Sequence, residues 1–260
     1  MPITPDTMRI SPYTVLACQE NPPAGAHRLY TPVECRVTAT ITPNPMAATI
    51  QRISGNRDVA GDAYYLHFFN NKITSVRLPW PAPAGVQFFY TDNMSGCKFY
   101  VDRIGGSDQD IVVYHANTTQ HGPAAGTNAD VQDIAAVGVL DGLHNTAIAD
   151  YAPAVPVNAA SLQKSQYFGA AGREERRKQT QGRTKVEFIG GCTIMGFPGA
   201  ASWEFYYQTW GDVKYVRSTS IGKALFTGHW VYLHNRRVEG KIHEISYQAM
   251  KVVDWGKIWP

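Results

Sequence analysis

One cysteine and one histidine in this 260-residue chain have types and a spacing suited to nucleophilic catalysis. Cys97 directly precedes the alternating segment Lys98–Arg103, and His115 lies near the end of the apolar segment Ile111–Ala116. Both segments have the composition of β-strands, and the Gly- and Asp-rich residues 105–110 between them predict a turn. In an antiparallel hairpin the start of the first strand lies beside the end of the second. The sequence therefore predicts a thiol beside an imidazole at one end of a hairpin.

This pair is the minimum that cysteine-based catalysis requires. The thiolate is the attacking species, and a neighbouring imidazolium lowers the cysteine pKa. A third group must orient the ring, and the candidates are a backbone carbonyl near Tyr90 or Thr91 and the side chain of Asn117. Ser95 and Gly96 are small, which lets backbone and substrate approach the sulfur closely. The alternative is a structural cysteine in a turn and a histidine that ends a strand by chance.

The segment from Thr91 to Thr118 resembles the catalytic segment of the cytotoxic necrotizing factor deamidases. The residues that carry the likeness are Ser95-Gly96-Cys97, the short strand that follows, and the stretch Val113-Tyr114-His115-Ala116-Asn117-Thr118 after the turn. That family has a Leu-Ser-Gly-Cys motif and a Tyr-His-Ala-Gly-Thr-like stretch, and the Burkholderia lethal factor is similar. Here Met94 replaces the leucine, Asn117 replaces the glycine, and the gap from cysteine to histidine is a few residues longer.

The resemblance implies a bacterial toxin or effector that converts a glutamine side chain of a host protein to glutamate through a thioester on the cysteine. In these relatives the host protein is a Rho-family GTPase or a translation-initiation helicase, and no metal or organic cofactor takes part. Their third catalytic element is a main-chain carbonyl. In the lethal factor it lies six residues before the cysteine, an offset that falls on Thr91. Backbone N–H groups near the cysteine would hold the oxyanion.

The rest of the chain predicts an α+β protein. Asn128–Tyr151 has apolar residues at helical spacing, and Ser161–Gln181 suggests a second helix with a charged face. Residues 1–31 suggest an irregular lead-in, and Ala63–Phe69 and Lys72–Leu78 suggest a hairpin that turns at Asn70-Asn71. Further strands are expected at Glu34–Thr42, Gly85–Thr91, Thr184–Ile189, Trp203–Trp210, Val213–Thr219, Ala224–Leu233 and part of Lys241–Val253. We therefore expect one catalytic domain over 1–260, a mostly antiparallel β-sandwich flanked by helices, like that of the deamidase toxins.

Composition narrows the classes of partner. The net charge is only +3, and the basic residues 173–183 are mixed with glutamates, which favours a solvated helical face over a nucleic-acid site. No apolar run is long enough to span a membrane, and the first residues lack a Sec-type signal. We expect a protein secreted or injected by a signal-peptide-independent route, although a cytoplasmic protein would have the same features. The four cysteines form no CxxC pair.

Other motifs have simpler interpretations. Gly191-Cys192 follows a strand as a nucleophile would, but no histidine follows at hairpin distance, so a buried structural thiol is expected. Arg217–Ser220 resembles the Ser-Thr-Ser element of ADP-ribosyltransferase toxins, yet Glu239 and Glu244 are too far apart for the paired acids of those enzymes. Three histidines lie along aromatic strands without acidic partners in register and predict no metal site: His229, His234 and His243. Three tryptophans suggest core packing rather than a carbohydrate groove: Trp203, Trp210 and Trp230.

Three functions are consistent with these residues. The first is deamidation of a host glutamine. The second is a cysteine protease or a transglutaminase, which would form an acyl-enzyme with the same Cys97 and His115. The third is a non-catalytic, β-rich binding protein, in which Cys97 would be an unreactive thiol with a high pKa.

Overall fold

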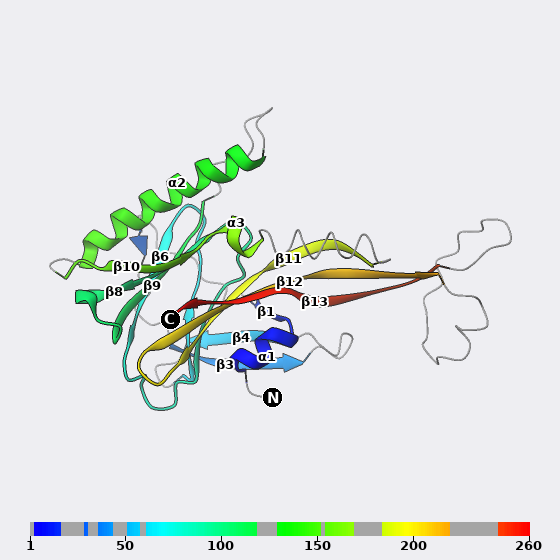
Figure 1. Ribbon diagram of the computed structural model, residues 1–260. Coiled ribbons are helices and arrows are strands. Elements are labelled where there is room, and N and C mark those ends of the chain that lie inside the picture. The colour runs from blue at the N-terminus through cyan, green and yellow to red at the C-terminus, as the bar shows by residue number, and fades with distance from the viewer. Residues whose placement is uncertain are drawn as a thin grey trace.

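The computed structural model describes residues 3–16, 29–30, 36–43, 51–57, 61–118, 129–151, 154–168, 184–218 and 244–260. Within these residues strands predominate, and most neighbouring strands are antiparallel (Figure 1). Three pairs are parallel, namely β1 with β4, β2 with β6, and β5 with β7. The expected α+β class with antiparallel-rich sheets is confirmed.

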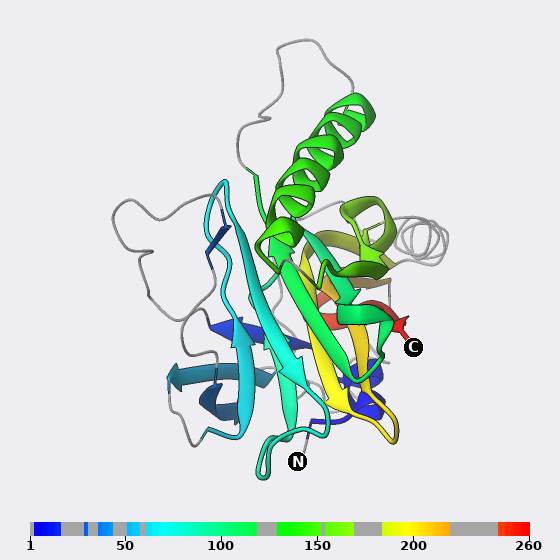
Figure 2. The same ribbon diagram turned by 90° about the vertical axis from the view of Figure 1, so that its left-hand side faces the viewer.

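The strands form two sheets. The larger has eight strands in the order β1-β4-β3-β5-β7-β11-β12-β13. Their bounds are Tyr13–Leu16, Gln51–Arg57, Arg36–Pro43, Ala63–Leu66, Phe88–Thr91, Thr184–Pro198, Trp203–Ser218 and Glu244–Trp259. The smaller has the order β10-β8-β9-β6-β2, with bounds Val157–Leu162, Lys98–Arg103, Asp110–Ala116, Ile73–Pro79 and Leu29–Tyr30. Figure 2 turns the smaller sheet toward the viewer, and Figure 1 shows β12 and β13 continuing as a long ribbon away from it.

Side chains from both sheets share one core. Phe99 and Val113 of the smaller sheet belong to the same buried cluster as Leu66, Phe89 and Phe205 of the larger. Burial of such aromatic and aliphatic side chains is the main favourable contribution to folding. The layers therefore meet face to face, and Cys97 belongs to this shared core.

Helices cover the outer faces. α2 (Ala129–Ile148) continues into a 3-10 turn, η2 (Ala149–Tyr151), and packs Leu140 and Leu143 against Tyr114 and Val112 of the smaller sheet. α1 (Pro5–Ile10) packs Met8 into the cluster on the outer face of the larger sheet. The helix expected over Asn128–Tyr151 is confirmed. Because α2 covers the sheet, β9 is buried on both faces, which explains its almost wholly apolar sequence.

The hairpin of β8 and β9 has the predicted pairing. Lys98 lies opposite Ala116 and Phe99 lies opposite His115. The connection contains a short 3-10 turn, η1 (Ile104–Gly106), in which Gly105 and Gly106 have φ angles of 59° and 75°. Glycine adopts this left-handed region without steric cost. The two glycines therefore let the chain reverse and set the register that aligns Cys97 with His115.

The expected hairpin of Ala63–Phe69 with Lys72–Leu78 is wrong. β5 lies in the larger sheet between β3 and β7, whereas β6 lies in the smaller sheet between β9 and β2. The turn at Asn71, which has a φ angle of 60°, carries the chain from one sheet to the other. Both strands are largely buried, and their short sequences indicate burial but not which strands they pair with.

Two further expectations need correction. The irregular lead-in contains α1 and β1, because Thr4 and Thr7 form a capping box that starts the helix. Ser161 and Leu162 belong to β10, which pairs with β8, and only α3 (Lys164–Tyr167) is helical after them. Residues 169–181 of the expected second helix lie outside the described residues.

The C-terminal strands are longer than predicted. Trp203–Trp210 and Val213–Thr219 are parts of one strand, β12, because β11 and β13 pair with it on both sides across Gly211. β11 extends beyond Ile189, and β13 extends beyond Val253. The expected strand Ala224–Leu233 lies outside the described residues.

Candidate active site

The hairpin places Cys97 and His115 at the same end and on the same face. His115 lies opposite Phe99, and Cys97 precedes Phe99 by two residues, so its side chain has the same orientation as that of Phe99. Cys97 is therefore the diagonal neighbour of His115 across the ladder. The predicted hairpin is present and brings both residues to one end of the ladder, whereas their pairing as a catalytic dyad stays a prediction.

The sulfur has a hydrogen-bond donor, and that donor is Asn117 rather than His115. The Asn117 Nδ2 group donates to Cys97 Sγ at 3.0 Å. The backbone groups of Ser95 and Gly96 also hydrogen-bond to the thiol and favour its charged form. The carbonyl of Cys97 accepts from the Tyr167 hydroxyl at 3.0 Å, so α3 fixes the backbone of this residue. The sequence-predicted supporting residues Ser95, Gly96 and Asn117 thus surround the sulfur.

His115 is fully buried, and neither ring nitrogen has a hydrogen-bond partner among the described residues. Its nearest ring neighbour is Phe68, with the centroids 5.6 Å apart. An unpaired buried polar group costs about 1–3 kcal/mol, so native proteins rarely retain one without a reason. An imidazole with both nitrogens unsatisfied has free capacity to accept a proton from an incoming group.

Thr91 lies at the end of β7, fully buried and opposite Leu66 of β5. Its hydroxyl donates to the backbone carbonyl of Asp92 at 2.8 Å. The His115 ring is not hydrogen-bonded to the Thr91 carbonyl in this arrangement, because neither ring nitrogen has a partner in the described part of the chain. The orienting role expected for Thr91 stays a prediction.

Burial sets the protonation of the pair. It raises the pKa of the Cys97 thiol to about 11, despite the opposing hydrogen bonds from Asn117, Ser95 and Gly96. Burial also lowers the pKa of His115 to about 4, against the opposing negative charge of Asp92. At neutral pH the pair is therefore a thiol and a neutral imidazole. Such a pair can react if the imidazole removes the thiol proton as the sulfur attacks.

The two residues before Cys97 lie at the surface, although Cys97 itself is buried. Ser95 is exposed and Gly96 is partly exposed. A β-carbon built on Gly96 would meet no heavy atom within 4 Å. The small residues of this dipeptide therefore leave free space on their own side of the chain.

Sequence reasoning missed a carboxylate and a second histidine beside the pair. The Asp92 side chain is almost fully buried, and it accepts hydrogen bonds from the Tyr65 hydroxyl at 2.5 Å and the Phe68 N–H at 3.0 Å. It also forms an ion pair with Nδ1 of His67. The available signal was an aspartate directly after a buried apolar strand, at the end of the strand that leads to Cys97.

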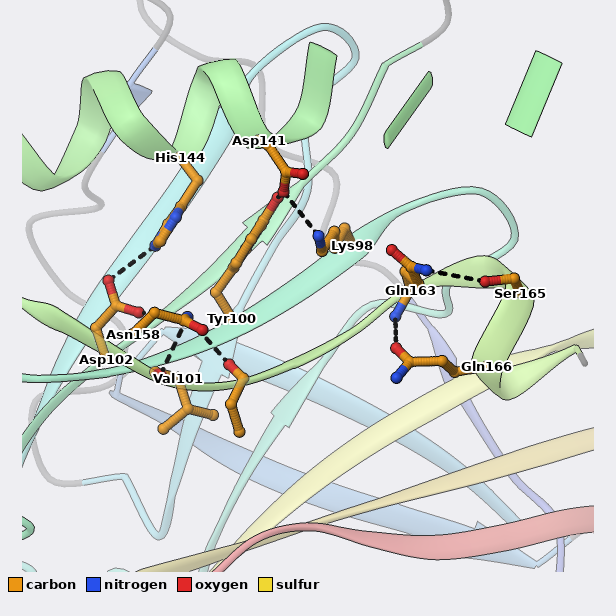
Figure 3. A network of polar contacts seen from close by, with 11 residues as sticks. Lys98, Tyr100, Val101, Asp102, Asp141, His144, Asn158, Gln163, Ser165 and Gln166 are labelled. Carbon is orange, nitrogen blue, oxygen red and sulfur yellow. Dashed lines mark hydrogen bonds and ion pairs between the residues drawn. The ribbon is translucent and has the colours of Figure 1, made fainter. Parts of the chain in front are cut away.

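A second polar network holds α2 to the outer face of β8 (Figure 3). Lys98 Nζ and the Tyr100 hydroxyl both donate to Asp141 of α2 at 2.7 Å. His144 of α2 lies 2.8 Å from the Asp102 carboxylate and stacks on Tyr100 with centroids 4.0 Å apart. Because Lys98 directly follows Cys97, this network fixes the start of the strand that comes after Cys97. No sequence pattern indicated this network.

Cys192 has the expected character of a buried thiol. It is fully buried, and burial raises its pKa. Its backbone exchanges two hydrogen bonds with Met94, at 2.7 and 2.8 Å, so β11 supports the loop that leads to Cys97. This arrangement gives Cys192 a structural role.

The remaining sequence candidates lie in the core or outside the described residues. Trp203 donates to the Pro79 carbonyl, and Trp210 donates to the Thr193 hydroxyl, so both pack inside the protein. The other candidates fall within 219–243 and are outside the described residues: His229, His234, His243, Trp230 and Glu239. In the described part of the chain no three His, Cys, Asp or Glu side chains gather closely enough to bind a metal. None of the described helices has the length and apolar character needed to cross a membrane.

A cavity of about 560 Å³ lies away from the pair. It is lined by Arg77, Trp80, Tyr64, Pro79, Gln109 and Asp110. Pro79 pairs with Asp110 at the end of the β6–β9 ladder opposite to His115. Arg77 is already held by Asp110 in an ion pair. The cavity is therefore remote from the candidate chemistry.

The chain matches no protein-family model, and no curated protein sequence matches it.

Proposed function

We propose that this protein is a cysteine-dependent glutamine deamidase that acts on a host protein. One observation carries the proposal. The hairpin brings Cys97 to the same end as a buried His115, whose two ring nitrogens lack partners among the residues that the structure describes, and an amide donates to the sulfur. The resemblance of 91–118 to the necrotizing factor deamidases supports it, as does the α+β fold with two antiparallel-rich sheets. We also propose that residues 1–260 form a single catalytic domain with a fold like that of the deamidase toxins.

The proposed reaction uses both residues of the pair. His115 takes the proton of the Cys97 thiol as the sulfur bonds to the amide carbon. Backbone N–H groups near the sulfur stabilise the oxyanion, and the protonated His115 gives its proton to the nitrogen, which leaves as ammonia. His115 then removes a proton from water, whose oxygen attacks the thioester. The carbon–sulfur bond breaks, and glutamate and the thiol are restored.

The burial of the thiol favours a second candidate, a non-catalytic β-rich binding protein. Cys97 is only 2% exposed, and burial raises its pKa to about 11. Its sulfur accepts a hydrogen bond from Asn117 and not from His115. A purely structural cysteine would have these properties, so the two candidates differ in whether Cys97 reacts.

The test uses purified Rho-family GTPases and a translation-initiation helicase as substrates, with peptide mass spectrometry as the readout. Deamidation adds about 1 Da to a glutamine and, in ¹⁸O-water, about 3 Da, because hydrolysis of the thioester incorporates solvent oxygen. Chain cleavage would indicate a protease, and amine incorporation without hydrolysis would indicate a transglutaminase.

The matched variants are Cys97→Ala, His115→Ala and Cys192→Ala. The deamidase requires that the first two abolish the mass gain and that the third retains it. A mass gain that survives Cys97→Ala would refute the assignment of the nucleophile.

A further inference from the structure

Asp92 and His67 lie at the carboxyl ends of two neighbouring parallel strands. β5 and β7 pair in parallel up to Leu66 and Thr91, and His67 and Asp92 are the next residues of each strand. The Asp92 N–H continues the ladder by donating to the Leu66 carbonyl at 3.3 Å. Functional groups gather at the carboxyl ends of parallel strands, because loops leave the sheet there and expose side chains. This strand end is also where the chain proceeds to Cys97.

The Asp92 carboxylate is built into the protein interior. It is 1% exposed, and Tyr65, Phe68 and His67 together provide partners for both oxygens. A buried carboxylate without partners would be strongly disfavoured. Three donors from one short segment therefore fix the position of this negative charge.

This cluster lies against His115. The Thr74 hydroxyl is 2.7 Å from the His67 carbonyl and 3.3 Å from the His115 carbonyl, so a single side chain joins the two backbones. The Phe68 ring lies 5.7 Å from the His67 ring and 5.6 Å from the His115 ring. The charge of Asp92 opposes the lowering effect of burial on the His115 pKa, and His67 adds to that lowering.

We propose that Asp92, held by Tyr65 and His67, is a positioning residue whose fixed negative charge stabilises His115 while it carries the proton of Cys97. The inference rests on the proposed function. His115 has no hydrogen-bond acceptor among the described residues. The negative charge of the nearby Asp92 carboxylate can therefore stabilise the protonated ring only through space. Preorganised charges act strongly where water is excluded.

The experiment measures the His115 imidazole directly. The full chain is labelled with ¹³C-histidine, and the titration midpoint of His115 is followed by NMR in wild type, Asp92→Asn, His67→Gln and Tyr65→Phe. Asp92→Asn should lower the midpoint, because it removes the favourable negative charge. His67→Gln should raise it, because it removes a like charge. Tyr65→Phe keeps the charge of Asp92 but removes one of the hydrogen bonds that hold it, so its midpoint should move less than that of Asp92→Asn.

The turnover of a deamidated substrate provides the second readout. Asp92→Asn should lower kcat by about 10- to 100-fold, corresponding to one to two pKa units, with KM unchanged. Asp92→Glu should restore part of the rate. An unchanged His115 midpoint in Asp92→Asn overturns the inference, whatever His67→Gln shows. If Asp92→Asn does not fold, Asp92→Ser also removes the charge and is judged by the same criterion.

These outcomes separate the inference from the proposed function. A wild-type protein without deamidase activity refutes the function, whereas the NMR midpoints still decide whether Asp92 acts on His115. A normal activity with unchanged midpoints refutes the inference alone.

Discussion

Replacing Asn117 by leucine should make the Cys97 thiol less acidic and slower to alkylate. The Asn117 amide donates to the sulfur at 3.0 Å and is the strongest of the contacts that oppose the effect of burial on its pKa. A hydrogen bond to a charged group contributes about 1.5–3 kcal/mol, or roughly one to two pKa units. Leucine has a similar size and no donor, so the thiolate should become about 10- to 100-fold scarcer at a given pH.

The assay is the rate of alkylation by iodoacetamide between pH 7 and pH 10.5, with each cysteine assigned by peptide mass spectrometry. Burial raises the pKa of wild-type Cys97 to about 11. At pH 8 only about one thiol in a thousand is then ionised, compared with about one in four for an ordinary cysteine. Wild-type Cys97 should therefore react about 200-fold more slowly than a free thiol, and the rate should rise tenfold per pH unit.

The matched control is Thr118→Val, because the hydroxyl of this neighbouring residue contacts Asn71 instead of the sulfur. Its alkylation rate should equal that of wild type. A wild-type rate that levels off near pH 8.5, or an Asn117→Leu rate equal to or above wild type, would refute the reasoning about this hydrogen bond.

Further predictions concern stability and access. His115→Leu should unfold at the same urea concentration as wild type or a higher one while abolishing activity, because it removes a buried ring whose two nitrogens have no partner in the described part of the chain. Burial opposes the ionisation of Asp141, but hydrogen bonds from Lys98 and Tyr100 lower its pKa overall. The contribution of the Asp141 carboxylate to stability is therefore present above its ordinary pKa and lost as the pH falls through the lowered value. In urea unfolding, Asp141→Asn should have a lower free energy of unfolding than wild type at pH 7, and this difference should shrink below about pH 4. Gly96→Ala should leave thermal stability unchanged but raise KM, because the added methyl meets no protein atom and lies where substrate approaches. Gly61→Ala is its counterpart and should lower the melting temperature sharply, because the new β-carbon would lie 2.2 Å from the Val37 backbone.

Local sequence patterns predicted the β8–β9 hairpin, which contains His115 and directly follows Cys97. The strand that follows Cys97 and the strand that ends at Ala116 are consecutive in the sequence, and the Gly-rich turn between them fixes their register. α2 was predicted for the same reason, since helical spacing is a local property. The structure confirmed both.

The contacts between distant segments could not be predicted in this way. Asp92 and His67 meet only because β5 and β7 pair in parallel across 25 residues. The short apolar segment Ala63–Leu66 indicates a buried strand but not which strands pair with it, and its predicted pairing with Lys72–Leu78 was wrong. The hydrogen bond from Asn117 to the Cys97 sulfur also depends on the side-chain rotamers at the end of the ladder, and sequence spacing does not determine these rotamers.

The most direct test of the central claim is the mass of glutamine-containing peptides from a eukaryotic cytosolic extract treated with the protein. We predict a gain of about 1 Da on specific glutamines with wild type and with Cys192→Ala, and none with Cys97→Ala or His115→Ala. An extract without such a gain under wild-type treatment, or with the same gain under Cys97→Ala treatment, would contradict the account.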